Sequence, residues 1–132
     1  MNNFSKNILN LSGTPDGFDA NLLSNFITVN QKSIIFVARD DKRLDLMRKS
    51  LWFFSPNIPI LDFPSWDCLP YDRVSPNADV SSARMATLAA LSSGFEAPIV
   101  LLTTLNAITQ YIPNRTIVSN NSFVAIVGRT IN

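Results

Sequence analysis

Short runs of consecutive apolar residues alternate along this chain with segments whose apolar residues recur at helical spacing. The most continuous runs occupy 33–38, 59–63 and 98–103. Uninterrupted apolar runs of this length are typical of parallel strands covered on both faces, because strands with one solvent face alternate apolar and polar residues. The pattern therefore predicts an α/β fold, with a three-layer parallel sheet and helices on both faces.

Segments with helical periodicity connect these runs. Apolar residues three and four apart predict helices over 18–27, 41–54, 80–93 and 105–112. Asp16 or Asp19 can cap the first helix, Asp40 or Asp41 the second, and Thr104 the last. The side chains expected to face the core from the second and third helices are Leu44, Met47, Leu51, Phe54, Met85, Leu88 and Leu91.

Three further apolar stretches are short. Residues 8–11 precede a glycine-containing turn, and 116–118 and 123–127 are flanked by polar residues near the end of the chain. Each stretch is expected to be a strand. By contrast, 64–79 contains a proline at every sixth residue and no periodic pattern. A connection of this length is usually a functional or interaction loop.

The composition excludes several classes of protein. The chain has 132 residues, 46% of them apolar, which is enough for one domain with a packed core. It contains no histidine and one cysteine, so histidine-dependent catalysis and an internal disulfide are both excluded. That cysteine, Cys68, has no basic neighbour in sequence and is expected to be inert. The formal net charge of +1 argues against a free-standing nucleic-acid binder.

No segment has the pattern of a targeting or membrane-spanning sequence. The first residues lack a basic stretch that leads into a long apolar run, as a secretory signal requires. Every apolar run is also far shorter than the roughly 20 residues that span a bilayer. The sequence therefore predicts a cytoplasmic protein without a membrane partner.

The turn from Gly13 to Asp19 stands where a phosphate-binding loop would stand, between an apolar run and a helix. A working loop, G-x-x-x-x-G-K-[ST], binds phosphate through backbone N–H groups and a lysine, and Mg²⁺ through a hydroxyl. Here Gly13 and Gly17 are one residue too close, no lysine follows, and Pro15 offers no N–H. Asp16 and Asp19 would also repel phosphate. The sequence predicts a P-loop NTPase-type lobe with a degenerate phosphate loop, and no catalytic, cofactor-binding or metal-binding residue.

A long proline-containing motif carries a family resemblance. Residues Phe63–Asn77 read FPSWDCLPYDRVSPN, which resembles the F-P-x-W-[DE]-x-L-P-Y-[DE]-x-x-S-P motif of the bacterial transcription-repair coupling factors (Mfd). Residues 82–88, 98–107 and 127–131 resemble further stretches of the same family. The likeness extends over roughly 8–131.

The resemblance implies a RecA-like lobe in a larger protein. The N-terminal region of that family is similar to UvrB, so 1–118 is expected to be a UvrB-like domain 1a lobe and 119–132 the truncated start of a second, UvrA-recruiting domain. In the family this region is catalytically inactive, while an ATP-dependent DNA translocase downstream displaces stalled RNA polymerase for nucleotide excision repair. The implied partners are the remaining domains of the parent protein, with UvrA and RNA polymerase reached only through domains outside these 132 residues.

Two other functions stay open. A lobe of a UvrB-like or helicase NTPase that completes its site with another chain would need the lysine and hydroxyl that 13–19 lacks. A standalone interaction domain would bind UvrA without the rest of the parent. If the chain is a non-catalytic lobe of a coupling factor, no cofactor is expected.

The long loop and the helix after it supply candidate contact residues. The possible interaction loop consists of Trp66, Leu69, Pro70, Tyr71, Arg73 and Arg84. An aromatic pair on a proline-stiffened loop can anchor a neighbouring domain or stack on a base, or it can pin the loop to the sheet. Nearby carboxylates at Asp67, Asp72 and Asp79 are expected to form turns and caps rather than a metal site.

The second helix carries the densest group of basic residues. The possible basic contact face consists of Lys42, Arg43, Arg48 and Lys49. Acidic neighbours dilute its charge, and only residues three or four apart share one face of a helix. A solvated helix surface is the alternative, so DNA binding by this chain is expected to be weak or absent.

Overall fold

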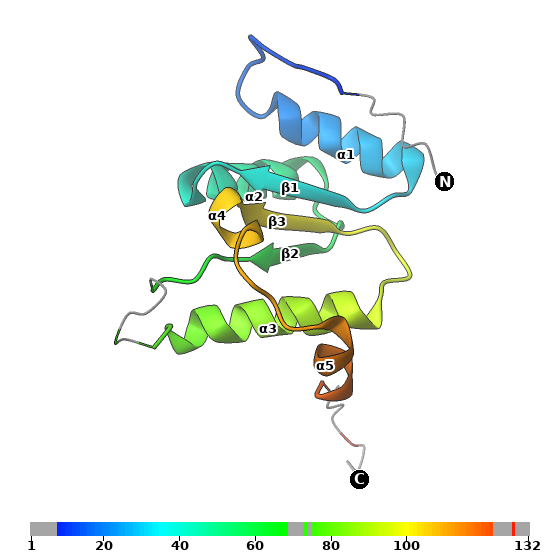
Figure 1. The fold of residues 1–132 in the computed structure, drawn as a ribbon. Coiled ribbons are helices and arrows are strands. Elements are labelled where there is room, and N and C mark those ends of the chain that lie inside the picture. The colour runs from blue at the N-terminus through cyan, green and yellow to red at the C-terminus, as the bar shows by residue number, and fades with distance from the viewer. Residues whose placement is uncertain (1–7, 69–72, 74, 123–127, 129–132) are drawn as a thin grey trace.

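Helices and strands alternate along the chain (Figure 1). The computed structural model describes residues 8–68, 73, 75–122 and 128. Their elements, in order, are α1 (Phe18–Asn30), β1 (Ile34–Ala38), α2 (Asp41–Phe54), β2 (Ile60–Phe63), α3 (Ala78–Ser93), β3 (Val100–Thr104), α4 (Leu105–Ile108) and α5 (Arg115–Asn120).

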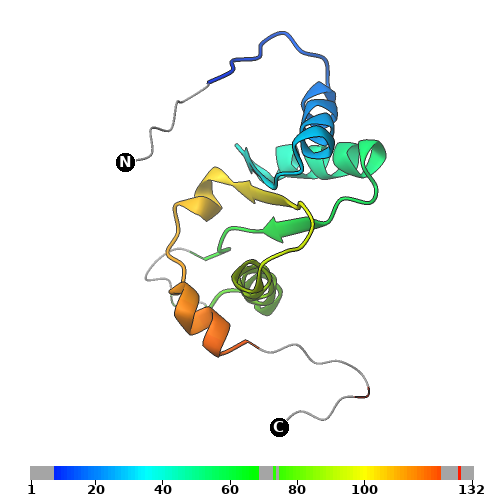
Figure 2. The ribbon, with the colours of Figure 1, turned by 90° about the vertical axis from the view of Figure 1, so that its right-hand side faces the viewer.

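The described strands form one parallel sheet in the order β1-β3-β2. Val100 in the central strand lies opposite both Ile34 in β1 and Ile60 in β2. Both views place α1 and α2 on the β1 side of the molecule and α3 and α5 on the β2 side (Figures 1 and 2). The predicted α/β class, with a parallel sheet flanked by helices, is confirmed.

The main core lies between the sheet and the helices α1 and α2. Its buried members are Ala20, Ile27, Ala38, Leu44, Met47, Leu51, Val100 and Leu102. Removing such side chains from water is the principal stabilising contribution. The predicted inner face of α2 is therefore confirmed except at Phe54, which is 41% exposed because it lies at the last residue of the helix.

Side-chain caps fix the starts of most helices. Asp40 accepts a hydrogen bond from the Arg43 N–H at 2.8 Å, and Thr104 accepts one from the Ala107 N–H at 3.3 Å, as predicted. The predicted aspartate cap of α1 is wrong. Its cap position is Gly17, at a φ of 81°, which glycine adopts without strain, and no side chain caps the helix.

Neutralising Asp40 is expected to remove a pH-dependent part of stability. The hydrogen bond from the Arg43 N–H, with a smaller contribution from Arg39, holds the pKa of Asp40 below its ordinary value of 3.8. A carboxyl group whose pKa is depressed by folding stabilises the protein above its unfolded pKa, and this contribution is lost as the pH falls through the folded pKa.

The melting temperatures of the wild type, Asp40→Asn and Asp40→Ser should be compared from pH 6 to pH 2.5. Both replacements keep a capping acceptor. The advantage of the wild type over both variants is expected to shrink below about pH 4. A gap that stays constant with pH would contradict a charge-dependent cap.

Two predicted strands are wrong. Residues 8–11 form no strand, and Ile8 and Leu9 are 75% and 74% exposed, because no described strand lies beside them to accept their hydrogen bonds. Residues 116–118 belong to α5, where Asn114 accepts a hydrogen bond from the Thr116 N–H at 2.9 Å. This cap outweighs the β-propensity of the sequence. The expected strand at 123–127 lies outside the described residues.

The end of the described chain also differs from expectation. The last predicted helix, 105–112, is only four residues long, because the chain leaves the helical path after Ile108. Helix α5 follows, with Val118 buried at 4% exposure, and the expected domain division between 118 and 119 stays a prediction.

Candidate functional site

The turn from Gly13 to Asp19 is held by a hydrogen bond within its backbone and by contacts of the Asp19 carboxylate. Gly13 and Gly17 both have positive φ, and the Phe18 N–H donates to the Pro15 carbonyl oxygen at 3.2 Å. The Asp19 carboxylate accepts a hydrogen bond from the Ala20 N–H at 2.9 Å and forms an ion pair with Arg43 of α2. The carboxylate of Asp19 is therefore directed toward α2.

A hollow of about 470 Å³ lies at the carboxyl end of β1. It is lined by Asp19, Phe36, Val37, Ala38, Arg39 and Arg43. Ligands of open α/β sheets commonly bind beyond the carboxyl ends of the strands. Both cations of this hollow already have carboxylate partners, since Arg43 pairs with Asp19 and Arg39 pairs with Asp40 at 2.9 Å. Their charge is therefore largely offset.

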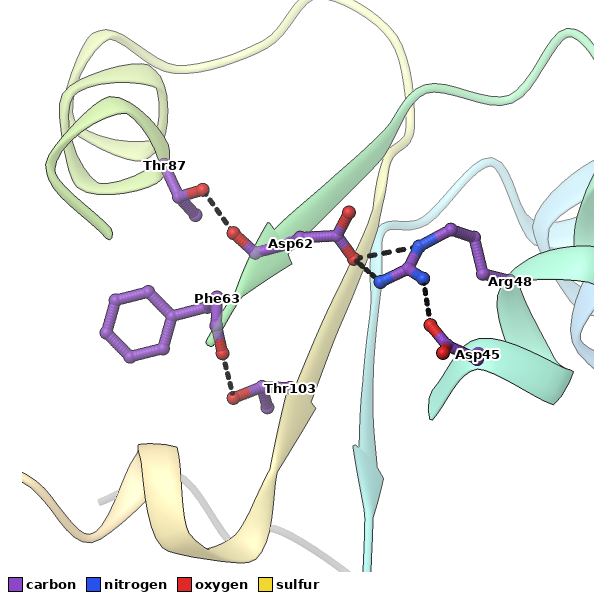
Figure 3. A network of polar contacts seen from close by, with 6 residues as sticks. All are labelled: Asp45, Arg48, Asp62, Phe63, Thr87 and Thr103. Atoms are coloured by element: carbon purple, nitrogen blue, oxygen red, sulfur yellow. Dashed lines mark hydrogen bonds and ion pairs between the residues drawn. The ribbon is translucent and has the colours of Figure 1, made fainter. Parts of the chain in front are cut away.

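The predicted basic contact face is divided by ion pairs. Figure 3 shows Arg48 between the carboxylates of Asp45 and Asp62, with 2.8 Å separating Nη2 from Oδ1 of Asp62. The hydrogen bond from Arg48 to Asp62 is the main cause that raises the pKa of Arg48. Among the described residues, Lys42 and Lys49 form no ion pair and are exposed. The four basic residues thus have two different environments.

Asp62 is bonded at the outer edge of β2, and Phe63 is bonded on the inner side, to the central strand. Figure 3 shows the Asp62 carbonyl oxygen accepting a hydrogen bond from Thr87 Oγ1 of α3 at 2.5 Å, while the Asp62 side chain turns toward Arg48. Thr103 Oγ1 donates to the Phe63 carbonyl oxygen at 2.9 Å. Helix α3 therefore protects this edge of the sheet. In the sequence, only the presence of the two threonines indicates this contact.

Arg84 of α3 is the most deeply buried charged residue near the predicted interaction loop. It is 1% exposed, and its guanidinium carbon lies 4.2 Å from the Phe63 ring centroid and 4.4 Å from that of Trp66. Nη1 donates to the Pro64 carbonyl oxygen at 2.6 Å and to Gln110 Oε1 at 3.1 Å. Burial lowers the pKa of Arg84.

The position of Arg84 changes the expected inner face of α3. The prediction that Met85 faces inward is wrong, since Met85 is 42% exposed, while Arg84 and Thr87 are buried. The two polar residues face inward because backbone acceptors and aromatic rings satisfy them there. A buried arginine in place of an apolar side chain was missed because periodicity counts only apolar residues.

The other residues of the predicted interaction loop are only partly described. Trp66 is half-buried, and its backbone N–H donates to Gln110 Oε1 at 2.9 Å, whereas Arg73 is exposed. Leu69, Pro70 and Tyr71 lie outside the described residues.

The carboxylate of Asp67 and the backbone of Asp79 both make structural contacts beside this loop. Asp67 accepts hydrogen bonds from the Asn77 N–H at 3.1 and 3.3 Å, and Asn77 caps α3 by accepting from the Asp79 N–H at 2.9 Å. Asp72 lies outside the described residues. The described part of the chain holds no group of three metal-binding side chains, and its cysteine, Cys68, is free and half-buried.

No described strand pairs with the outer edge of β1, whereas a side chain of α3 bonds the outer edge of β2. The Ile34 N–H donates toward β3, to the Ile99 carbonyl oxygen at 2.9 Å. The backbone N–H and C=O groups of successive residues in a strand point alternately toward its two edges. Those of Ile35 and Val37 therefore point away from β3. The Ile35 side chain, which is 66% exposed, projects from the sheet face that carries Leu101 and lies toward Leu88 and Leu91 of α3. The unpaired backbone groups along the strand edge are a ready template for pairing with another strand.

Apolar side chains are also exposed on α1, which lies near that edge (Figure 1). Phe18, Leu22, Phe26 and Val29 recur at helical spacing and are 36–79% exposed. The opposite face of α1 carries Ala20 and Ile27, which are buried in the core. Helix α1 thus has two apolar faces, of which one is covered by the described residues. No described helix is long and apolar enough to cross a membrane.

Comparison with known proteins finds transcription-repair-coupling factors. The chain is 34% identical to that of Rickettsia prowazekii over 93 residues, or 70% of this chain, and 33% identical to that of Rickettsia typhi over 85 residues, or 64% of this chain. It is 37% identical to that of Rickettsia conorii over 78 residues, or 59% of this chain. The matches cover 6–8% of the length of these relatives. Neither a protein-family model nor a solved structure matches the chain.

Proposed function

We propose that this chain is a non-catalytic N-terminal module of a transcription-repair coupling factor. The observation that carries the proposal is the 34% identity, over 70% of the chain, to a protein of that name. The motif Phe63–Asn77 supports it. The proposed parent is an ATP-dependent DNA translocase of the cytoplasm, which displaces stalled RNA polymerase and recruits UvrA for excision repair.

The contacts of the degenerate turn support a module without nucleotide chemistry. A phosphate group needs free N–H groups and a free cation. Here Asp19 has taken the cation Arg43 as its own partner, and Pro15 supplies no N–H. Under this proposal, an internal ion pair lies at the turn where a phosphate loop would otherwise be expected.

The open side of the molecule supports a role as one part of a larger fold. The backbone edge of β1 has no strand partner among the described residues, and α1 carries an exposed apolar stripe; β1 and α1 both lie on the side of the molecule away from α3 (Figure 1). We assign this side to the remaining domains of the parent, because exposed apolar surface of this kind marks a contact with protein. UvrA and RNA polymerase would be reached through those domains, and DNA binding by this chain would be weak or absent.

Titration of the chain with ATP and Mg²⁺ in a calorimeter tests the absence of a nucleotide site. We expect no binding heat at millimolar nucleotide. The turn from Gly13 to Asp19 lacks the phosphate-binding lysine, and its Asp19 carboxylate is paired with Arg43. A dissociation constant near or below about 100 μM would favour the alternative, an NTPase lobe that completes its site with another chain.

Hydrogen exchange tests the assignment of the open edge. The amide protons of Ile35 and Val37 are expected to exchange rapidly in the isolated chain, because their N–H groups point away from β3. In the full-length parent we expect strong protection of both, while the Leu102 amide in the central strand is protected in either form. Rapid exchange of Ile35 and Val37 in the parent as well would contradict the assignment.

A further inference from the structure

The indole of Trp66 is held by residues that come from distant parts of the sequence. Arg84 of α3 lies between the rings of Phe63 and Trp66, at 4.2 and 4.4 Å from their centroids. Gln110, which follows α4, uses one oxygen to accept hydrogen bonds from Arg84 Nη1 and from the Trp66 backbone N–H. Side chain and backbone of Trp66 are therefore fixed by two linked residues.

The guanidinium group is unusually placed for a purely space-filling side chain. It is 1% exposed and, in the part of the chain that the structure describes, it forms no ion pair. A buried cation without a carboxylate is costly unless other groups stabilise it. Here the faces of two aromatic rings and two oxygen acceptors provide that stabilisation.

We propose that Arg84, together with Gln110, is the positioning residue that sets the orientation of Trp66 at the start of the 64–77 segment. The guanidinium carbon lies over the indole ring, and Nη1 donates a hydrogen bond to the Pro64 carbonyl oxygen. A lysine ammonium could donate to an oxygen but could not stack as a plane between two rings. The positions of Pro64 and Trp66 are thus coupled to α3 and to the chain after α4.

This inference does not depend on the identity of the parent protein. Its test uses the complete chain with Trp52→Phe, which leaves Trp66 as the one tryptophan; Trp52 is 71% exposed, so its loss should not disturb the fold. The variants Arg84→Lys, Gln110→Leu and Gln110→Glu are added to this background. Arg48→Lys is the matched control, because Arg48 is ion-paired on another face of the molecule. Circular dichroism establishes that each variant is folded.

Acrylamide quenching of Trp66 fluorescence is the first measurement. We expect Arg84→Lys and Gln110→Leu to raise the quenching constant about twofold and to shift the emission to longer wavelength, because the indole is released to solvent. Gln110→Glu keeps the oxygen that accepts both hydrogen bonds, so its quenching constant should equal that of the Trp52→Phe protein. The same is expected of Arg48→Lys. Unchanged quenching in a folded Arg84→Lys variant would overturn the proposal.

A measurement on the unmodified chain does not depend on how the variants fold. A side chain between two ring faces experiences their ring currents, so the δ-methylene protons of Arg84 are expected to resonate upfield of those of Arg115, which is exposed. Shifts equal to those of Arg115 would show that the stacked arrangement is absent in solution and would also overturn the proposal.

Discussion

Replacing Leu102 with alanine is expected to lower the free energy of unfolding by about 2–5 kcal/mol. Leu102 is fully buried in β3, the central strand, and belongs to the core cluster between the sheet and the helices α1 and α2. The variant loses the transfer free energy of the deleted groups and leaves a cavity that neighbours in two layers can fill only in part. Urea unfolding followed by circular dichroism measures the difference.

Ile35→Ala is the matched control for Leu102→Ala. Ile35 lies on the same sheet but is 66% exposed, at the open edge strand β1. In the isolated chain we expect its replacement to cost less than about 1 kcal/mol. Equal costs for the two variants in the isolated chain would mean that both faces of the sheet are packed alike.

Arg84→Ala is expected to destabilise the chain by about 2–5 kcal/mol as well, for a different reason. The replacement removes the cation from between the rings of Phe63 and Trp66 and leaves the Pro64 carbonyl oxygen without its donor. A buried acceptor without a partner costs the full desolvation of that group. Thermal and urea unfolding both measure the loss.

Two variants separate packing from charge at this position. Arg84→Met refills most of the volume with a flexible side chain that packs well against aromatic rings, so we expect a smaller loss than for Arg84→Ala. Arg115→Ala removes an exposed arginine whose contact is a 3.2 Å hydrogen bond to the Ser92 carbonyl oxygen, and should change stability by less than about 0.5 kcal/mol. An Arg84→Ala effect as small as that of Arg115→Ala would contradict the buried role.

The candidate site could be predicted only where sequence neighbours create it. The loss of the phosphate loop is visible from Gly13 to Asp19, because the loop chemistry is contiguous in sequence. The partner of Asp19 is not visible, because Arg43 follows 24 residues later and approaches through the packing of α1 on α2. The sequence likewise predicts one basic face on α2, because it does not show which carboxylates lie nearby. In the structure Arg43 pairs with Asp19 and Arg48 with Asp62.

The sequence by itself determined the α/β class and the three strands of the sheet, because uninterrupted apolar runs and helical periods are local patterns. It also determined the caps at Asp40 and Thr104, which are bonds within one turn. Only the tertiary structure decided that residues 116–118 are helical, that no described strand pairs with the outer edge of β1, and that Arg84 is buried between two rings. Each of these depends on which distant segment lies alongside, and hydrogen-bond satisfaction and burial are settled only once that neighbour is present.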